Sequence, residues 1–162
     1  RLASMLVALS KRSRPASVPG ALAIRREFSD ILDEIHDRIE KQLEGEFGEE
    51  KKFLKQRTDV SGHWLDDREK EMLAAVEARY LQERESLMEL LLSWVGDVLR
   101  HQAGSDRFDL PEFSAATREL AQRWDAATAN RCVRELRRLG ANLRTNAQEG
   151  LALDSAFIAA FA

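Results

Sequence analysis

The sequence predicts an all-α protein in which a long antiparallel helical hairpin is joined to a C-terminal helical bundle. The 162 residues include only 8 glycines and 3 prolines, too few for the many turns of a β-sandwich or β-barrel. Charged residues make up 33 % of the chain and aromatic residues 7 %, a composition typical of long helices that are partly solvated. Apolar residues recur at steps of three and four over long stretches, which is the period of an amphipathic helix.

Residues 1–20 are predicted to be the end of a preceding domain followed by a linker. Apolar side chains have helical spacing over residues 1–10, whereas residues 11–20 hold two of the three prolines together with serines and basic residues, as linkers and turns do. The chain starts at Arg1 rather than at methionine. We therefore expect it to be a piece of a longer protein.

Residues 21–85 are predicted to form an extended helical hairpin arm. A single apolar stripe predicts one helix over about 21–59, and a second stripe, close to a heptad repeat, predicts another over about 64–101. Gly45 and Gly48 each lower the helix propensity of the first helix by about 1 kcal/mol relative to alanine. A kink or a frayed turn is expected there.

Residues 86–162 are predicted to form a globular helical base. Residues 87–99 are apolar nearly all round, and such a helix must be buried on several sides. Three more helices are expected over about 111–124, 127–145 and 151–161. The side chains expected in the core of the base are Leu87, Leu91, Trp94, Val98, Trp124, Leu136, Leu143, Leu151, Leu153 and Phe157.

The start of the 111–124 helix carries the clearest local signal in the sequence. Asp109 precedes Glu112 by three residues, the spacing of a capping box, in which each side chain accepts from a backbone N–H of the first turn. Pro111 stands early in the helix, where its missing N–H does no harm. We therefore expect Asp109 to cap this helix.

Composition also limits the possible functions. The net charge of −3 provides no global field that would attract nucleic acid. The single cysteine, Cys132, rules out an internal disulfide and fits a reducing, cytoplasmic location. No apolar run reaches the roughly 18 residues of a membrane span. The sequence contains no phosphate-binding glycine loop, nucleophile elbow or HExxH motif, so we expect no catalytic residue, cofactor, metal or small-molecule substrate.

Three groups of residues could in principle carry chemistry, and each has a simpler interpretation. His63 with Asp66 and Asp67 could ligate a metal, but acidic residues at a helix N-terminus are explained as well by the helix dipole. His36 lies among acidic residues on what we expect to be a solvated, charged face. Cys132 has no neighbouring histidine, so we expect a small buried residue rather than a nucleophile.

A basic stripe is the strongest candidate for a binding surface. Arg131, Arg134 and Arg138 stand at i, i+3 and i+7 on one helix face, with Arg137 and Arg144 nearby. Such a stripe could follow the phosphates of a nucleic acid or contact an acidic protein partner. Alternatively, it is a solvated face paired with acids such as Glu135.

The C-terminal half resembles a known family. The segments LLLSWVGDVLRHQAG (90–104) and LRTNAQEGLALDSAFIAAF (143–161) resemble the C-terminal domain of the delta-prime subunits of bacterial DNA polymerase III. The residues on the closing pattern of that family are Leu143, Asn146, Leu151, Leu153, Asp154 and Phe157. Gln148 replaces a second asparagine of the pattern, Asp154 replaces glutamate, and Gly96 stands where arginine is usual. The resemblance covers about residues 86–161, and residues 21–85 fit only as an extension of the long helices.

The resemblance implies a role in a clamp loader, the AAA+ assembly that opens the sliding clamp and places it on primed DNA. The chain would be a non-catalytic collar domain that binds the other clamp-loader subunits, gamma/tau and delta, and meets DNA only through the full complex. The parent complex would belong to a DNA-directed DNA polymerase. The related gamma/tau subunits share the helical architecture. Two other functions stay open: a coiled-coil scaffold that binds a protein partner, and a direct nucleic-acid binder through Arg131, Arg134 and Arg138.

Overall fold

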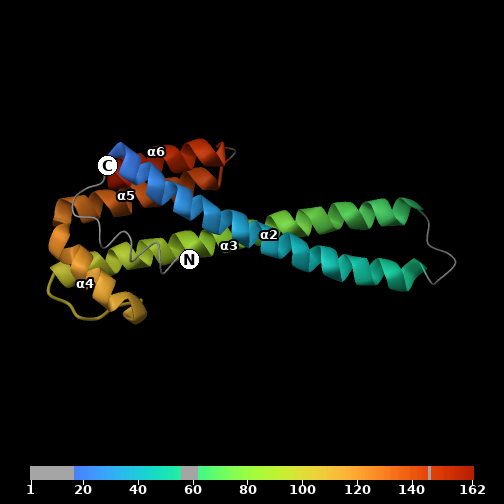
Figure 1. The fold of residues 1–162 in the computed structure, drawn as a ribbon, viewed down its shortest axis with the longest axis horizontal. Helices are drawn as coiled ribbons and strands as arrows, with labels where there is room; N and C mark the ends of the chain where they lie inside the picture. The colour runs from blue at the N-terminus through green and yellow to red at the C-terminus, as the bar shows by residue number, and fades with distance from the viewer. Residues whose placement is uncertain (1–16, 56–61, 146) are drawn as a thin grey trace. The chain divides into compact units, whose positions relative to one another are not determined.

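The computed structural model describes residues 17–55, 62–145 and 147–162 (Figure 1). The elements are α2 (Val18–Lys55), α3 (Gly62–Gln102), the 3-10 helix η1 (Pro111–Phe113), α4 (Ser114–Arg123), α5 (Ala126–Leu143) and α6 (Glu149–Phe161). These described ranges contain no β-strand, which confirms the all-α prediction. The helix predicted over residues 1–10 lies outside the described residues.

The chain divides into two compact units. The arm is residues 32–85, and the base combines residues 86–162 with residues 17–31. The sequence predicted that the arm begins at residue 21. The first turns of α2, up to Ile31, belong to the base instead. The reason is that Ile24 and Phe28 are buried, with the Phe28 ring 5.2 Å from the Phe157 ring of α6.

Aromatic side chains of α2, α3 and α6, together with Trp124 at the C-cap of α4, form much of the core of the base. The ring of Phe157 lies 5.4 Å from that of Phe161, and the latter lies 6.2 Å from that of Trp124. Trp94 of α3 is fully buried. α5 packs along α6, and Figure 1 shows the two helices as adjacent dark orange and red ribbons.

Nine of the ten side chains expected in the core are buried, and Leu151 is not. Leu151 is 64 % exposed, whereas Leu153, Phe157 and Phe161 of the same helix are buried. Residues two apart lie on nearly opposite sides of an α-helix. Burying Leu153 therefore turns Leu151 toward solvent.

The end of α3 is a Schellman motif centred on Gly104. The Ser105 N–H donates to the Arg100 carbonyl at 3.0 Å, and the Gly104 N–H donates to the His101 carbonyl at 2.9 Å. Gly104 has a φ of 86°, which side chains other than glycine rarely adopt. This motif ends α3 where the sequence predicted.

The capping box predicted at Asp109 is wrong. The residue at the N-cap of η1 is Leu110, and no side chain caps this helix. The Asp109 carboxylate instead forms an ion pair with Arg100, and the backbone N–H groups of Asp109 and Leu110 donate to Asp97 of α3 at 2.8 and 2.9 Å. The buried Asp97 carboxylate thus accepts from the Asp109 N–H, which Glu112 would have accepted from in a capping box. Pro111 does stand at the start of η1, as predicted.

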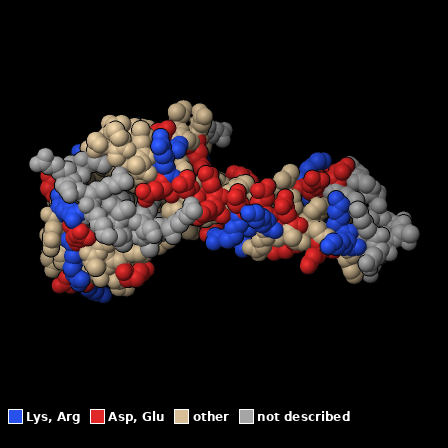
Figure 2. All heavy atoms as spheres, viewed as in Figure 1, with Lys and Arg blue, Asp and Glu red and all other residues tan. Residues whose placement is uncertain are grey.

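In the arm, α2 and α3 run antiparallel to each other (Figure 1). Ile39 of α2 and Val76 of α3 are buried, and an Arg68–Glu50 ion pair of 2.8 Å joins the two helices. The helix continues without a break through Gly45 and Gly48, so α2 has no frayed turn at these glycines. Figure 2 shows acidic and basic side chains side by side along the visible face of the arm.

Candidate interaction surface

Helix α5 begins with a side-chain cap. The Asp125 carboxylate accepts a hydrogen bond of 2.7 Å from the Thr128 backbone N–H, which satisfies one of the free donors of the first turn. Hydrogen bonding from the Thr128 side chain, and then from its backbone, lowers the pKa of Asp125 below the ordinary value. The cap fixes where α5 begins.

The inner face of α5 is apolar and fully used in packing. Its buried residues are Ala129, Cys132, Leu136, Leu139 and Leu143, spaced by three and four. Burial raises the pKa of the Cys132 thiol well above its ordinary value, so this sulfur stays protonated and unreactive. Cys132 is thus the small buried residue that the sequence indicated.

The outer face of α5 is basic. Arg134, Arg137 and Arg138 are exposed, and we call these three residues the α5 arginine face. The helix carries four arginines against one glutamate. Arg134 pairs with its neighbour Glu135 at 3.1 Å. Within the described part of the chain, Arg137 and Arg138 have no ion pair or hydrogen bond to a side chain.

The stripe predicted from the sequence differs from the exposed face. Arg131 is half-buried, and its Nε and Nη2 atoms are shielded from solvent without a partner in the described chain. Arg137, which the i, i+3, i+7 spacing passed over, is exposed between Arg134 and Arg138. The sequence could have indicated that Arg137 belongs to this face. It stands three residues after Arg134 and therefore on the same side of the helix, away from Leu136 and Leu139.

Asp97 lies in the first resembling segment and is fully buried. Its Oδ1 accepts from Arg100 at 2.5 Å and from the Asp109 N–H, while its Oδ2 accepts from the Leu110 N–H. Hydrogen bonds from Arg100 to Asp109 and then to Asp97 raise the pKa of that guanidinium. The Asp97 carboxylate is therefore committed to holding the α3–η1 loop.

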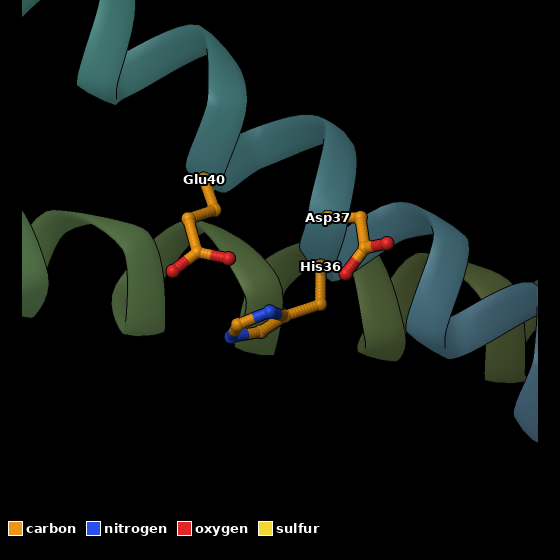
Figure 3. A group of neighbouring side chains, drawn as sticks. All are labelled: His36, Asp37 and Glu40. Atoms are coloured by element: carbon orange, nitrogen blue, oxygen red, sulfur yellow. The ribbon is translucent and has the colours of Figure 1, made fainter.

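A second cluster of polar side chains, His36, Asp37 and Glu40, lies on α2 (Figure 3). One nitrogen of His36 and one carboxylate oxygen each of Asp37 and Glu40 all lie within 4.8 Å of one another. Of the other candidate group, Asp66 and Asp67 are exposed, with Asp67 3.3 Å from Lys70. The side chain of His63 lies outside the described residues.

In comparisons with known proteins, no protein-family model matches the chain, and neither a curated protein nor a solved structure matches it. Among the described residues, no helix has the length and apolar character needed to cross a membrane.

Proposed function

We propose that this chain is the collar domain of a bacterial DNA polymerase III clamp-loader subunit of the delta-prime class. In this role it joins the gamma/tau and delta subunits in the cytoplasm and supports sliding-clamp loading during DNA replication. The observation that carries the proposal is the position of the two resembling segments. Residues 90–104 lie at the end of α3, and residues 143–161 run from the end of α5 through α6, within the base.

The base has the physical properties that an oligomerisation domain needs. Its core anchors, such as Trp94 and Phe157, are fully buried, so its surface is presented on a rigid framework. Arg137 and Arg138 extend from this framework without acidic partners in the described chain. Charge complementarity favours an acidic patch on a neighbouring subunit as their contact.

The environments of the single cysteine and of the buried acid Asp97 support a non-catalytic role. The only thiol, Cys132, is buried and protonated, and the buried acid Asp97 is held by three hydrogen bonds. Neither group can act as a nucleophile or a general base in these positions. In this proposal the chain contributes assembly, and chemistry belongs to other parts of the complex.

Co-purification with the gamma/tau and delta subunits tests the proposal. Reversing two charges of the α5 arginine face, Arg137→Glu with Arg138→Glu, should remove the chain from the reconstituted complex. A control variant, Arg107→Glu, reverses one exposed charge elsewhere in the base. Both variants should keep the wild-type melting temperature. A double variant that assembles as well as the control would contradict a contact through α5.

Direct nucleic-acid binding is a second candidate, because arginines without internal partners also suit phosphates. It predicts that the isolated chain binds DNA with an affinity that falls steeply as salt increases. Arg137→Glu with Arg138→Glu would then lose both the binding and the salt dependence. Fluorescence anisotropy with a labelled duplex measures this, and we expect no salt-sensitive binding from the collar domain alone.

A scaffold role through the arm is the third candidate, and exposed apolar residues favour it. Phe53 of α2 and Leu73 of α3 are 60 % and 55 % exposed, as side chains that contact a partner helix would be. Assembly that is lost when the arm is shortened, but survives reversal of the α5 arginine face, would make the arm the binding element.

A further inference from the structure

Three side chains with metal-binding atoms converge on one side of α2 in the arm (Figure 3). His36 and Glu40 are one helical turn apart, so both extend from the same face. Asp37 flanks the histidine. The three ligand atoms lie within 4.8 Å of one another.

The surroundings leave these atoms free and hold the imidazole in place. Within the described residues, none of the three side chains has a hydrogen bond or ion pair. The neighbouring Gln42, by contrast, donates to Glu46 at 3.0 Å. The His36 ring packs edge-on against Tyr80 of α3, with centroids 5.2 Å apart and an interplanar angle of 75°, which limits the orientations that the ring can adopt.

We propose that His36, Asp37 and Glu40 bind a divalent transition-metal ion of the zinc type, with water completing the coordination. One imidazole nitrogen with two carboxylate oxygens is a zinc ligand set that leaves open positions. Mg²⁺ and Ca²⁺ prefer oxygen ligands alone. Two adjacent carboxylates repel each other, and a divalent cation relieves that repulsion.

The geometry needs only side-chain movement. Tetrahedral coordination at bond lengths of about 2.0 Å requires ligand atoms about 3.3 Å apart. Asp37 is exposed and Glu40 half-buried, so both carboxylates can rotate toward the imidazole. The ion would span one turn of α2 and stabilise the arm helix by binding only its folded form. This inference does not depend on the collar proposal.

Equilibrium dialysis of Zn²⁺ against the tag-free full chain tests the site. We expect saturable binding of one ion per chain, with an excess of Mg²⁺ failing to displace it. His36→Gln and Glu40→Gln should each weaken the affinity at least ten-fold. Two controls should bind as the wild type does: Asp33→Asn removes an exposed acid of α2 outside the cluster, and His101→Gln removes the histidine of the base.

Several outcomes would overturn the site. These are an absence of saturable Zn²⁺ binding, binding that survives both cluster substitutions, and an equal loss in Asp33→Asn, which would indicate diffuse charge attraction. Displacement by Mg²⁺ at equal concentration would contradict the metal class. If far-UV circular dichroism shows that His36→Gln is not folded, Glu40→Gln and Asp37→Asn decide the question, since neither side chain is buried.

Discussion

Asp97 is a charged side chain with no solvent exposure, and its two oxygens hold the backbone of the α3–η1 loop. Asp97→Asn keeps the size but replaces one acceptor oxygen with an amide NH2 group, a donor that would face the N–H or guanidinium donors around it. Losing hydrogen bonds to a buried charged group should lower the free energy of unfolding by about 2–4 kcal/mol. Urea unfolding measures this. The exposed Asp106 provides the control, and Asp106→Asn should leave the midpoint unchanged.

Trp94 combines a fully buried ring with an indole N–H that has no acceptor in the described residues. Trp94→Ala should lower the free energy of unfolding by about 3–5 kcal/mol, because it leaves a large cavity. Trp94→Phe fills most of that volume and removes the unsatisfied donor. We expect the phenylalanine variant to lose less than half as much stability. Equal losses in denaturant unfolding would show that the N–H has a partner after all.

Single residues also explain where sequence reasoning about the site fell short. The predicted stripe treated Arg131, Arg134 and Arg138 as equivalent, but spacing alone does not reveal that Arg131 is half-buried. Local spacing likewise suggested that Asp109 caps a helix, whereas the backbone N–H groups of Asp109 and Leu110 donate to Asp97 of α3. In both cases tertiary contacts override a pattern that local sequence can express.

At the scale of helices, two glycines allow a matched test. Gly104 adopts a positive φ, whereas Gly140 lies inside α5, and a Cβ at either position would meet open space. Gly104→Ala should destabilise the base by about 1–2 kcal/mol through backbone strain. Gly140→Ala should stabilise it by about 1 kcal/mol through helix propensity. Urea midpoints that move in the same direction would contradict this assignment.

The Asp125 cap makes the stability of α5 depend on pH. Because folding lowers the pKa of Asp125, the unfolded chain binds the proton more readily. The stabilisation is therefore complete above the ordinary pKa of about 3.9 and is lost as pH falls through the lower folded value. The difference in melting temperature between wild type and Asp125→Ala should thus be larger at pH 7 than at pH 3. Asp125→Asn, which caps without titrating, should show no such trend.

Most of the helices were predictable because their apolar period is a property of the chain itself. The predicted ranges 64–101, 127–145 and 151–161 lie within a few residues of α3, α5 and α6. The boundary of the arm was not predictable, because the apolar stripe of α2 continues unchanged past Ile31. Contacts with α6, such as the packing of Phe28 on Phe157 and the 2.8 Å ion pair of Arg25 with Asp154, assign the first turns of that helix to the base.

At the scale of the whole molecule, the division into two units implies that each can be altered separately. The aromatic contacts that join α2 to α6 in the base involve Phe28 and Phe157, and neither lies in residues 32–85. Contacts within the arm, such as the Arg68–Glu50 ion pair, involve no residue of the base. The arm can therefore be shortened without removing a core residue of the base.

The pairing of the two arm helices shows how to shorten it. His36 faces Tyr80, and Glu50 faces Arg68, so residue 44 lies opposite about residue 73. Replacing residues 45–72 with a short Gly/Ser loop should therefore keep the remaining helices in register. We expect the melting temperature of the base to change little, and the shortened chain should still co-purify with its clamp-loader partners.

The shortened chain also separates the two functional proposals. It retains the α5 arginine face and the His36 cluster with Tyr80, so both assembly and Zn²⁺ binding should survive. Loss of assembly alone would move the protein contact from α5 to the removed part of the arm. Loss of Zn²⁺ binding alone would mean that the cluster needs the full arm to hold its shape. Because the α5 arginine face lies in the base and the His36 cluster in the arm, neither result would explain the other.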